Sequence, residues 1–141
     1  MRMEKEFDVD RSRAEAAALL AADEVLCELF PDTRTEIVGK KGPRKTIESH
    51  YTALGREGTA TFHFDYAPGG DVRFEKVCDG HVWRELRGTV TLTERKDKTR
   101  VRIELEGRTK TLVPEFTIRG PMQDQLDQMA KALKRHLTAK A

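Results

Sequence analysis

Residues 60–66 read ATFHFDY and alternate without a break between apolar and polar side chains. Successive side chains of a β-strand point to opposite faces of its sheet, so this stretch predicts a strand with one buried and one solvated face. The buried face is the one shared by Ala60, Phe62, Phe64 and Tyr66. The aromatic side chains of this strand are therefore expected to face the protein interior.

The same period of two continues on both sides of this strand, from about residue 33 to residue 113. No helical stripe interrupts it, and turns rich in glycine, proline or charged residues divide it into segments. Gly107 is expected to mark a bulge or bend, because it stands alone within a strand pattern. The further strands expected in this antiparallel meander are residues 33–38, 44–54, 72–78, 82–93 and 101–113.

The segment before the meander predicts one strand and two short helices. Residues 4–10 alternate and are expected to add a strand, which gives about seven in all. An N-cap at Asp10 or Ser12 then predicts an alanine-rich helix over residues 14–22, and a second short helix follows before Pro31.

The segment after Pro114 returns to the helical period. Its apolar residues recur every three or four positions, which predicts one long amphipathic helix. These residues are Ile118, Met122, Leu126, Met129, Leu133 and Leu137. The expected fold class is α+β, with a curved antiparallel sheet around a long C-terminal helix.

The bulk composition predicts a single domain over residues 1–141. The 26 basic and 24 acidic side chains leave a net charge of +2, so we expect no binding to nucleic acid through charge alone. No apolar stretch is long enough for stable membrane insertion, and the acidic first ten residues do not read as a signal peptide, so we expect a cytoplasmic protein. Two cysteines, Cys27 and Cys78, are expected to stay thiols.

The order of these elements resembles the helix-grip fold of the Bet v 1-like, START-related (SRPBCC) superfamily, and within it the polyketide cyclase/dehydrase and coenzyme Q-binding branch. The resemblance implies a cavity between sheet and last helix that relatives use for lipids, quinones, hormones or polyketides. It carries over no catalytic residue. It rests on residues 26–30 ending at Pro31, the glycine loop 39–43, Leu86 with Gly88, and Pro114, Phe116 and Met122 before the last helix.

Strand parity and helical spacing select the side chains that would line this cavity. Lys76 and Arg84 fall on the inward parity, so each is expected at the sheet rim, in an ion pair, or against the polar end of a ligand. Trp83 has the opposite parity to Leu86 and faces solvent, a partner, or the core through a bulge. The expected cavity residues are Ile47, Ser49, Tyr51, Phe62, Phe64, Tyr66, Phe74, Lys76, Arg84, Leu86, Val90, Leu92, Met122, Leu126, Met129 and Leu133.

Other chemistry finds little support in the sequence. The four histidines are scattered without metal-ligand spacing, and no nucleophile elbow or phosphate loop occurs, so no metal, cofactor or catalytic residue is predicted. His50 and His63 are expected on the solvent side of their strands. Residues 39–43 are expected to form a hairpin turn, or a basic lip that meets an anionic head group.

Three functions remain open at this point. The first is non-catalytic binding or carrying of a hydrophobic small molecule: a lipid, an isoprenoid quinone or a polycyclic aromatic compound. The second is an enzyme of the polyketide aromatase/cyclase type, in which Tyr51, Tyr66 or Arg84 would orient the substrate and assist proton transfer. The third is a module that acts on a protein partner through the outer sheet face or Trp83.

Overall fold

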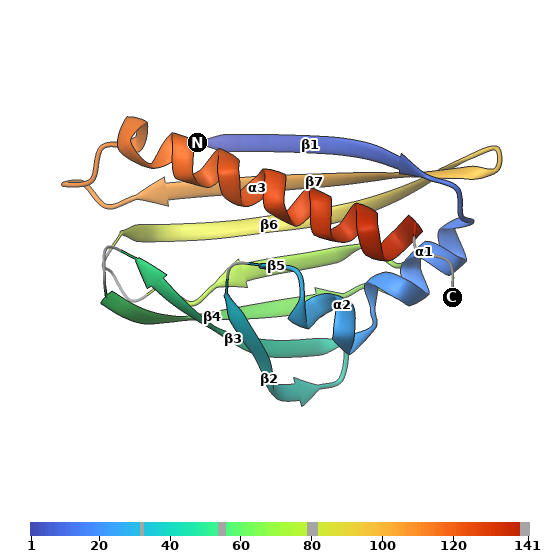
Figure 1. The fold of residues 1–141 in the computed structure, drawn as a ribbon, viewed down its shortest axis with the longest axis horizontal. Coiled ribbons are helices and arrows are strands. Elements are labelled where there is room, and N and C mark those ends of the chain that lie inside the picture. The colour runs from blue at the N-terminus through green and yellow to red at the C-terminus, as the bar shows by residue number, and fades with distance from the viewer. Residues whose placement is uncertain (32, 54–55, 79–81, 139–141) are drawn as a thin grey trace.

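The computed structural model describes residues 1–141 except 32, 54–55, 79–81 and 139–141. Its elements follow the expected order of one strand, two short helices, six strands and one long helix (Figure 1). The strands are β1 (Arg2–Val9), β2 (Arg34–Lys41), β3 (Arg44–Ala53), β4 (Arg56–Tyr66), β5 (Val72–Lys76), β6 (Trp83–Arg95) and β7 (Lys98–Thr109). The helices are α1 (Arg13–Leu20), α2 (Asp23–Cys27) and α3 (Glu115–Thr138).

All seven strands form one antiparallel sheet in the order β1-β7-β6-β5-β4-β3-β2. The chain order is kept from β2 to β7, and β1 adds to the far edge beside β7. Helix α3 runs obliquely across one face of the sheet, and α1 and α2 lie at one end of it (Figure 1). This arrangement confirms the expected α+β helix-grip fold.

The two short helices begin at residues that cap them or carry the appropriate charge. Ser12 forms a capping box with Glu15, in which each side chain bonds the other residue's backbone N–H, so α1 starts at the expected cap. Asp23 and Glu24 occupy the first turn of α2, where the helix dipole favours acids. Leu29 is buried beyond the end of α2, so the chain stays packed against the core after helical hydrogen bonding stops.

The core lies between the concave face of the sheet and the inner side of α3. Phe64, on the inward parity of β4, is 2% exposed, and Leu126 on α3 is 0% exposed. The Phe64 ring stacks on Phe74 of the neighbouring strand, with 5.0 Å between ring centroids. Because the alternating face of a strand and the stripe of a helix are the apolar surfaces of these elements, they pack against one another.

Several strand ends differ from the expected ones; β4, for example, already begins at Arg56 and β7 at Lys98. β2 continues through Gly39 to Lys41. Its pairing with β3 shifts register between Ile37 and Gly39 and then resumes. β5 stops at Lys76 and β7 at Thr109, earlier than the residue pattern indicates. The side-chain period alone does not show where the neighbouring strand stops offering hydrogen-bond partners.

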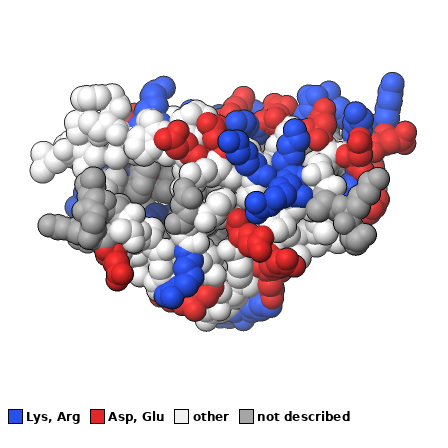
Figure 2. Space-filling view, in the orientation of Figure 1, with Lys and Arg blue, Asp and Glu red and all other residues white. Residues whose placement is uncertain are grey.

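Charged side chains cover the solvent-facing surfaces. On the outer face of the sheet, Arg102 of β7 pairs with Glu4 of β1 and with Glu104. Figure 2 shows positive and negative side chains interspersed over the side that carries α3. None of the described helices combines the length and the apolar character needed to span a bilayer.

Candidate ligand-binding site

A cavity of about 610 Å³ opens between the concave sheet face and the first half of α3. This volume falls within the range of roughly 300–1,000 Å³ that is usual for small-molecule sites. Five strands and the helix contribute to its wall, since β3 to β7 each place inward side chains there. The wall consists of Phe30, Thr33, Ser49, Tyr51, Thr52, Ala60, Phe62, Phe74, Lys76, Trp83, Leu86, Leu105, Ile118, Pro121, Met122, Asp124, Gln125, Gln128 and Met129.

The two halves of α3 contact the sheet differently. In the second half, Ala130, Leu133 and Leu137 are buried in the core, so this half closes the interior. In the first half, Ile118 is only partly buried and Phe116 is 80% exposed. The cavity therefore lies under the start of the helix, and exposed wall residues such as Pro121 and Asp124 belong to its mouth.

The inner wall is aromatic and aliphatic. The ring of Phe62 stacks on Phe30, with 5.2 Å between centroids, which ties the segment after α2 to the middle of β4. Met122 and Met129 are almost fully buried on the opposite wall. Flexible thioether side chains suit a pocket whose occupant varies in shape. These surfaces can hold an apolar body but supply few directional contacts.

A bulge in β6 decides where Trp83 and Arg84 lie. Trp83 pairs with Thr109 while Glu85 pairs with Arg108, so the residue between them is extra in the strand. The bulge puts Trp83 on the same side as Leu86, and both line the cavity. The prediction that Arg84 faces inward is therefore wrong, since its side chain is exposed and its Nη2 donates to the Thr111 hydroxyl at 3.5 Å.

Polar groups on the sheet side of the wall include a set of hydroxyls and one lysine. On the β2–β3 side, the hydroxyl of Ser49 shares a hydrogen bond of 2.9 Å with Thr35, whose hydroxyl also lies 3.2 Å from that of Thr33. On the central strand, Lys76 lies opposite Phe62. The hydroxyls bond one another, whereas the ammonium of Lys76 adds a positive charge to the wall.

The structure brings half of the expected cavity residues together around this space. These are Ser49, Tyr51, Phe62, Phe74, Lys76, Leu86, Met122 and Met129. Six others have the expected inward direction and are buried in the core, but they do not line the cavity. They are Ile47, Phe64, Val90, Leu92, Leu126 and Leu133.

Tyr66 is the last residue of β4, beyond the part of this strand that lines the cavity. Its ring is half-buried, and the Lys45 ammonium lies 4.8 Å from the ring centroid. Burial, followed by the nearby Asp23 and Cys27, raises the pKa of the Tyr66 hydroxyl far above its ordinary value. The side chain is therefore a neutral packing group and does not line the described cavity.

The alternating pattern could have identified some wall residues that the expected set omits. Leu105 follows the inward parity of β7, and Ile118 starts the apolar stripe of α3. Phe30 and Thr33 lie outside the helices and strands, so no side-chain period predicts their direction. Gln125 and Gln128 are polar side chains on the helix, and only the position of the helix shows that they border the cavity.

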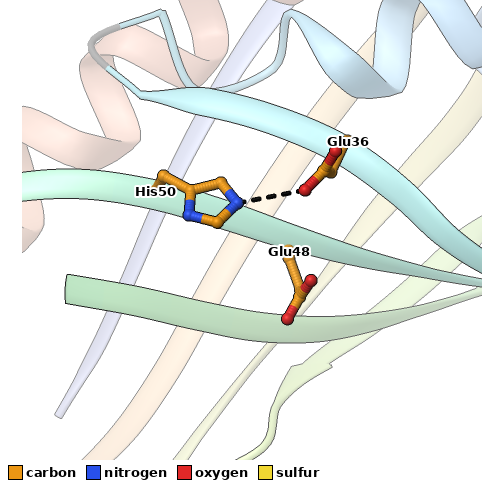
Figure 3. A group of neighbouring side chains, drawn as sticks. All are labelled: Glu36, Glu48 and His50. Carbon is orange, nitrogen blue, oxygen red and sulfur yellow. Dashed lines mark hydrogen bonds and ion pairs between the residues drawn. The ribbon is translucent and has the colours of Figure 1, made fainter.

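One group of described side chains has the composition and proximity of metal ligands. Glu36 on β2 and Glu48 and His50 on β3 place one ligand atom each within 4.8 Å of one another (Figure 3). His50 Nε2 lies 3.1 Å from Glu36 Oε1. The group is on the outer sheet face, away from the cavity, where His50 was expected to face solvent. Cys27 and Cys78 are both free thiols.

No protein-family model and no curated protein matches the chain. Solved structures do match over almost its whole length. A START superfamily protein from Mycobacterium smegmatis has a TM-score of 0.75 and 15% identity, with 96% of each chain covered. The Zhui aromatase/cyclase from Streptomyces sp. R1128 has a TM-score of 0.73 and 15% identity, over 99% of this chain and 96% of that one.

A third solved structure is a fragment of a STAR-related lipid transfer protein from Xanthomonas axonopodis. It has a TM-score of 0.69 and 16% identity, over 96% of this chain and 85% of that one. At such identities the likeness concerns the backbone arrangement. The chain therefore has the helix-grip fold that the START-related and Bet v 1-like proteins share.

Proposed function

We propose that the protein binds and carries a hydrophobic small molecule, such as a lipid, an isoprenoid quinone or a polycyclic aromatic compound, without converting it. The observation that carries this proposal is the cavity of about 610 Å³, whose inner wall is built from Phe62, Trp83, Leu86 and Met122. Removing apolar surface from water contributes about 25 cal/mol per Å², so burial alone can supply substantial affinity.

The described cavity wall offers little for acid–base catalysis. Its ionisable side chains are Tyr51, Lys76 and Asp124, and Tyr51 and Asp124 are exposed. No two of these three form a hydrogen bond or ion pair among the described residues, whereas a nucleophile and its base lie within hydrogen-bond reach. Binding of a ligand without converting it therefore needs no catalytic pair, which the described wall does not contain.

A polyketide aromatase/cyclase activity is the second candidate. It is favoured by the backbone likeness to the Zhui aromatase/cyclase. Of the three side chains that sequence reasoning assigned to it, only Tyr51 lines the cavity, while Tyr66 and Arg84 lie elsewhere. An action on a protein partner through Trp83 loses its basis, since that side chain belongs to the cavity wall.

The test combines ligand detection with a variant that fills the cavity. Native mass spectrometry of protein purified without denaturation should show a retained hydrophobic molecule, and Ala60→Leu should abolish its retention, because Ala60 lines the cavity and the larger side chain occupies it. Ala14→Leu is the matched control, since Ala14 is exposed on α1. The binding proposal fails if the Ala60 variant, still folded by circular dichroism, retains the molecule as the wild type does. Conversion of the retained molecule by the wild type would favour the cyclase alternative.

A further inference from the structure

Lys76 belongs to the cavity wall. Its strand, β5, is the central one, with three strands on either side. Val72 and Phe74 are buried, Arg73 and Glu75 are exposed, and Lys76 continues the inward parity. Its cross-strand neighbour Phe62 also lines the cavity. A cationic side chain therefore lies on the concave face at the end of the central strand.

Three other described lysines, Lys5, Lys40 and Lys45, share this inward parity, and each is paired with a carboxylate. Lys5 of β1 bonds Asp127 of α3 at 2.8 Å. Lys45 of β3 lies 2.7 Å from Asp23 of α2. The fold thus provides an acid where a lysine points toward the helices, because an inward charge without a partner is costly.

Lys76 has no such acid in the part of the chain that the structure describes, where its ammonium forms no ion pair and no hydrogen bond. The described wall contains one carboxylate, that of Asp124, which is exposed on α3 and is not within ion-pair distance of Lys76. The interior of the cavity therefore carries a positive charge whose counter-charge the described residues do not supply.

We infer that the ligand is an apolar molecule with one carboxylate, and that this carboxylate pairs with Lys76 while the apolar body lies against Phe62, Trp83 and Leu86. The inference rests on the proposed binding function and specifies its ligand class. Charge-assisted hydrogen bonds between an ammonium and a carboxylate are shorter and stronger than neutral ones. An alcohol of the same length would bury the same apolar surface without this bond.

The experiment compares ligands that share a chain and differ in the head group. Dodecanoic acid, dodecan-1-ol and dodecyltrimethylammonium are titrated by calorimetry and by displacement of the neutral dye Nile red. The wild type should bind the acid about tenfold to a hundredfold more tightly than the alcohol, as expected for one hydrogen bond to a charged group. The ammonium compound should bind more weakly than both, because its charge repels that of Lys76.

Variants test whether Lys76 causes the preference for the acid over the alcohol. Lys76→Met keeps most of the side-chain volume and should weaken binding of the acid about tenfold to a hundredfold while leaving the alcohol unchanged. Lys76→Arg should retain the preference for the acid, and Lys134→Met, on the exposed side of α3, should behave as the wild type. Thermal unfolding of each variant verifies that it is folded.

The outcomes separate this inference from the function on which it rests. If the wild type binds the acid and the alcohol equally, the carboxylate inference is overturned while apolar binding stands, and no variant is needed to see this. A preference for the acid that survives Lys76→Met also overturns it. If none of the three compounds binds by either method, the carboxylate inference fails, whereas the binding function is judged by whether native mass spectrometry shows a retained molecule.

Discussion

Gly107 shows how one residue shapes the cavity wall. A Cβ atom at this position of β7 would lie 2.5 Å from Cζ3 of Trp83, well inside van der Waals contact. The indole of Trp83 therefore occupies space that only a glycine leaves free. The irregularity expected at Gly107 is located in the facing strand instead, at the bulge between Trp83 and Glu85.

Gly107→Ala should lower the free energy of unfolding by about 1–3 kcal/mol, because the indole or the strand must move to admit the methyl group. Gly39→Ala is the control with the opposite sign. Gly39 lies in β2, where an added Cβ would be 3.7 Å from Cβ of Thr46, an ordinary van der Waals distance, so alanine should stabilise the strand by roughly 0.5–1 kcal/mol. Urea denaturation measures both. Equal changes in the two variants would refute the close packing of Trp83.

At the scale of elements, Asp23 joins α2 to the sheet. Its carboxylate bonds Lys40 of β2 at 2.5 Å and Lys45 of β3 at 2.7 Å. The hydrogen bond from Lys40, and then that from Lys45, holds the pKa of Asp23 below its ordinary value of 3.8. Because the pKa of Asp23 is lower in the folded than in the unfolded protein, the ionised carboxylate stabilises the fold fully at pH values above the unfolded-state pKa. This stabilisation is lost as the pH falls through 3.8 toward the folded-state pKa.

Asp23→Asn should therefore be less stable than the wild type at pH 7 and should lose less stability than the wild type between pH 7 and acid. Thermal unfolding midpoints over this pH range measure the difference. Asp10→Asn is the control, because Asp10 is 88% exposed and its nearest lysine nitrogen is 3.7 Å away. Parallel pH profiles for the wild type and Asp23→Asn would contradict the anchoring role.

Helix α3 is the element on which the sheet depends most. It supplies buried side chains such as Leu126 and Leu133 to the core, and its first half roofs the cavity. The concave face beneath it is apolar on five strands. Without the helix, this face would be exposed to water as one continuous apolar surface.

Removal of residues 122–141 should therefore give an insoluble chain, or a compact one that binds the dye 8-anilinonaphthalene-1-sulfonate and lacks fixed tertiary packing. Dye fluorescence and near-ultraviolet circular dichroism measure this directly. A truncated chain that stays monomeric with a sharp thermal transition would mean that the sheet is stable alone.

At the scale of the whole molecule, sheet and helix together enclose a space that neither encloses alone. A ligand that enters it binds the folded state and not the unfolded chain, so it stabilises the fold by mass action. At a free concentration 100 times the dissociation constant, the gain is about 2.7 kcal/mol.

Dodecanoic acid at saturating concentration should accordingly raise the midpoint of thermal unfolding of the wild type. The same concentration should leave Ala60→Leu unchanged, because its cavity is filled, and should stabilise Ala14→Leu as it does the wild type. Differential scanning calorimetry measures the three midpoints. A shift of the same size in Ala60→Leu would place the binding site outside the cavity.

The sequence by itself determined the fold class, the order of the elements and the direction of most inward side chains. These properties follow from local periods, two residues for strands and 3.6 for the helix, which are visible in any short window. Phe64, Phe74 and Leu126 are buried as their spacing predicts. The resemblance to helix-grip proteins then indicated that sheet and helix would enclose a cavity.

Tertiary structure alone decided which inward side chains reach that cavity and which charges have partners. The bulge at Arg84 reverses the parity of β6 there, and a bulge depends on the register with a neighbouring strand rather than on the strand's own residues. Lys5 and Lys45 are paired with acids from helices far away in the chain, whereas Lys76 has no acid partner among the residues that the structure describes. A local pattern carries no information about distances between segments remote in sequence, and those distances define the site.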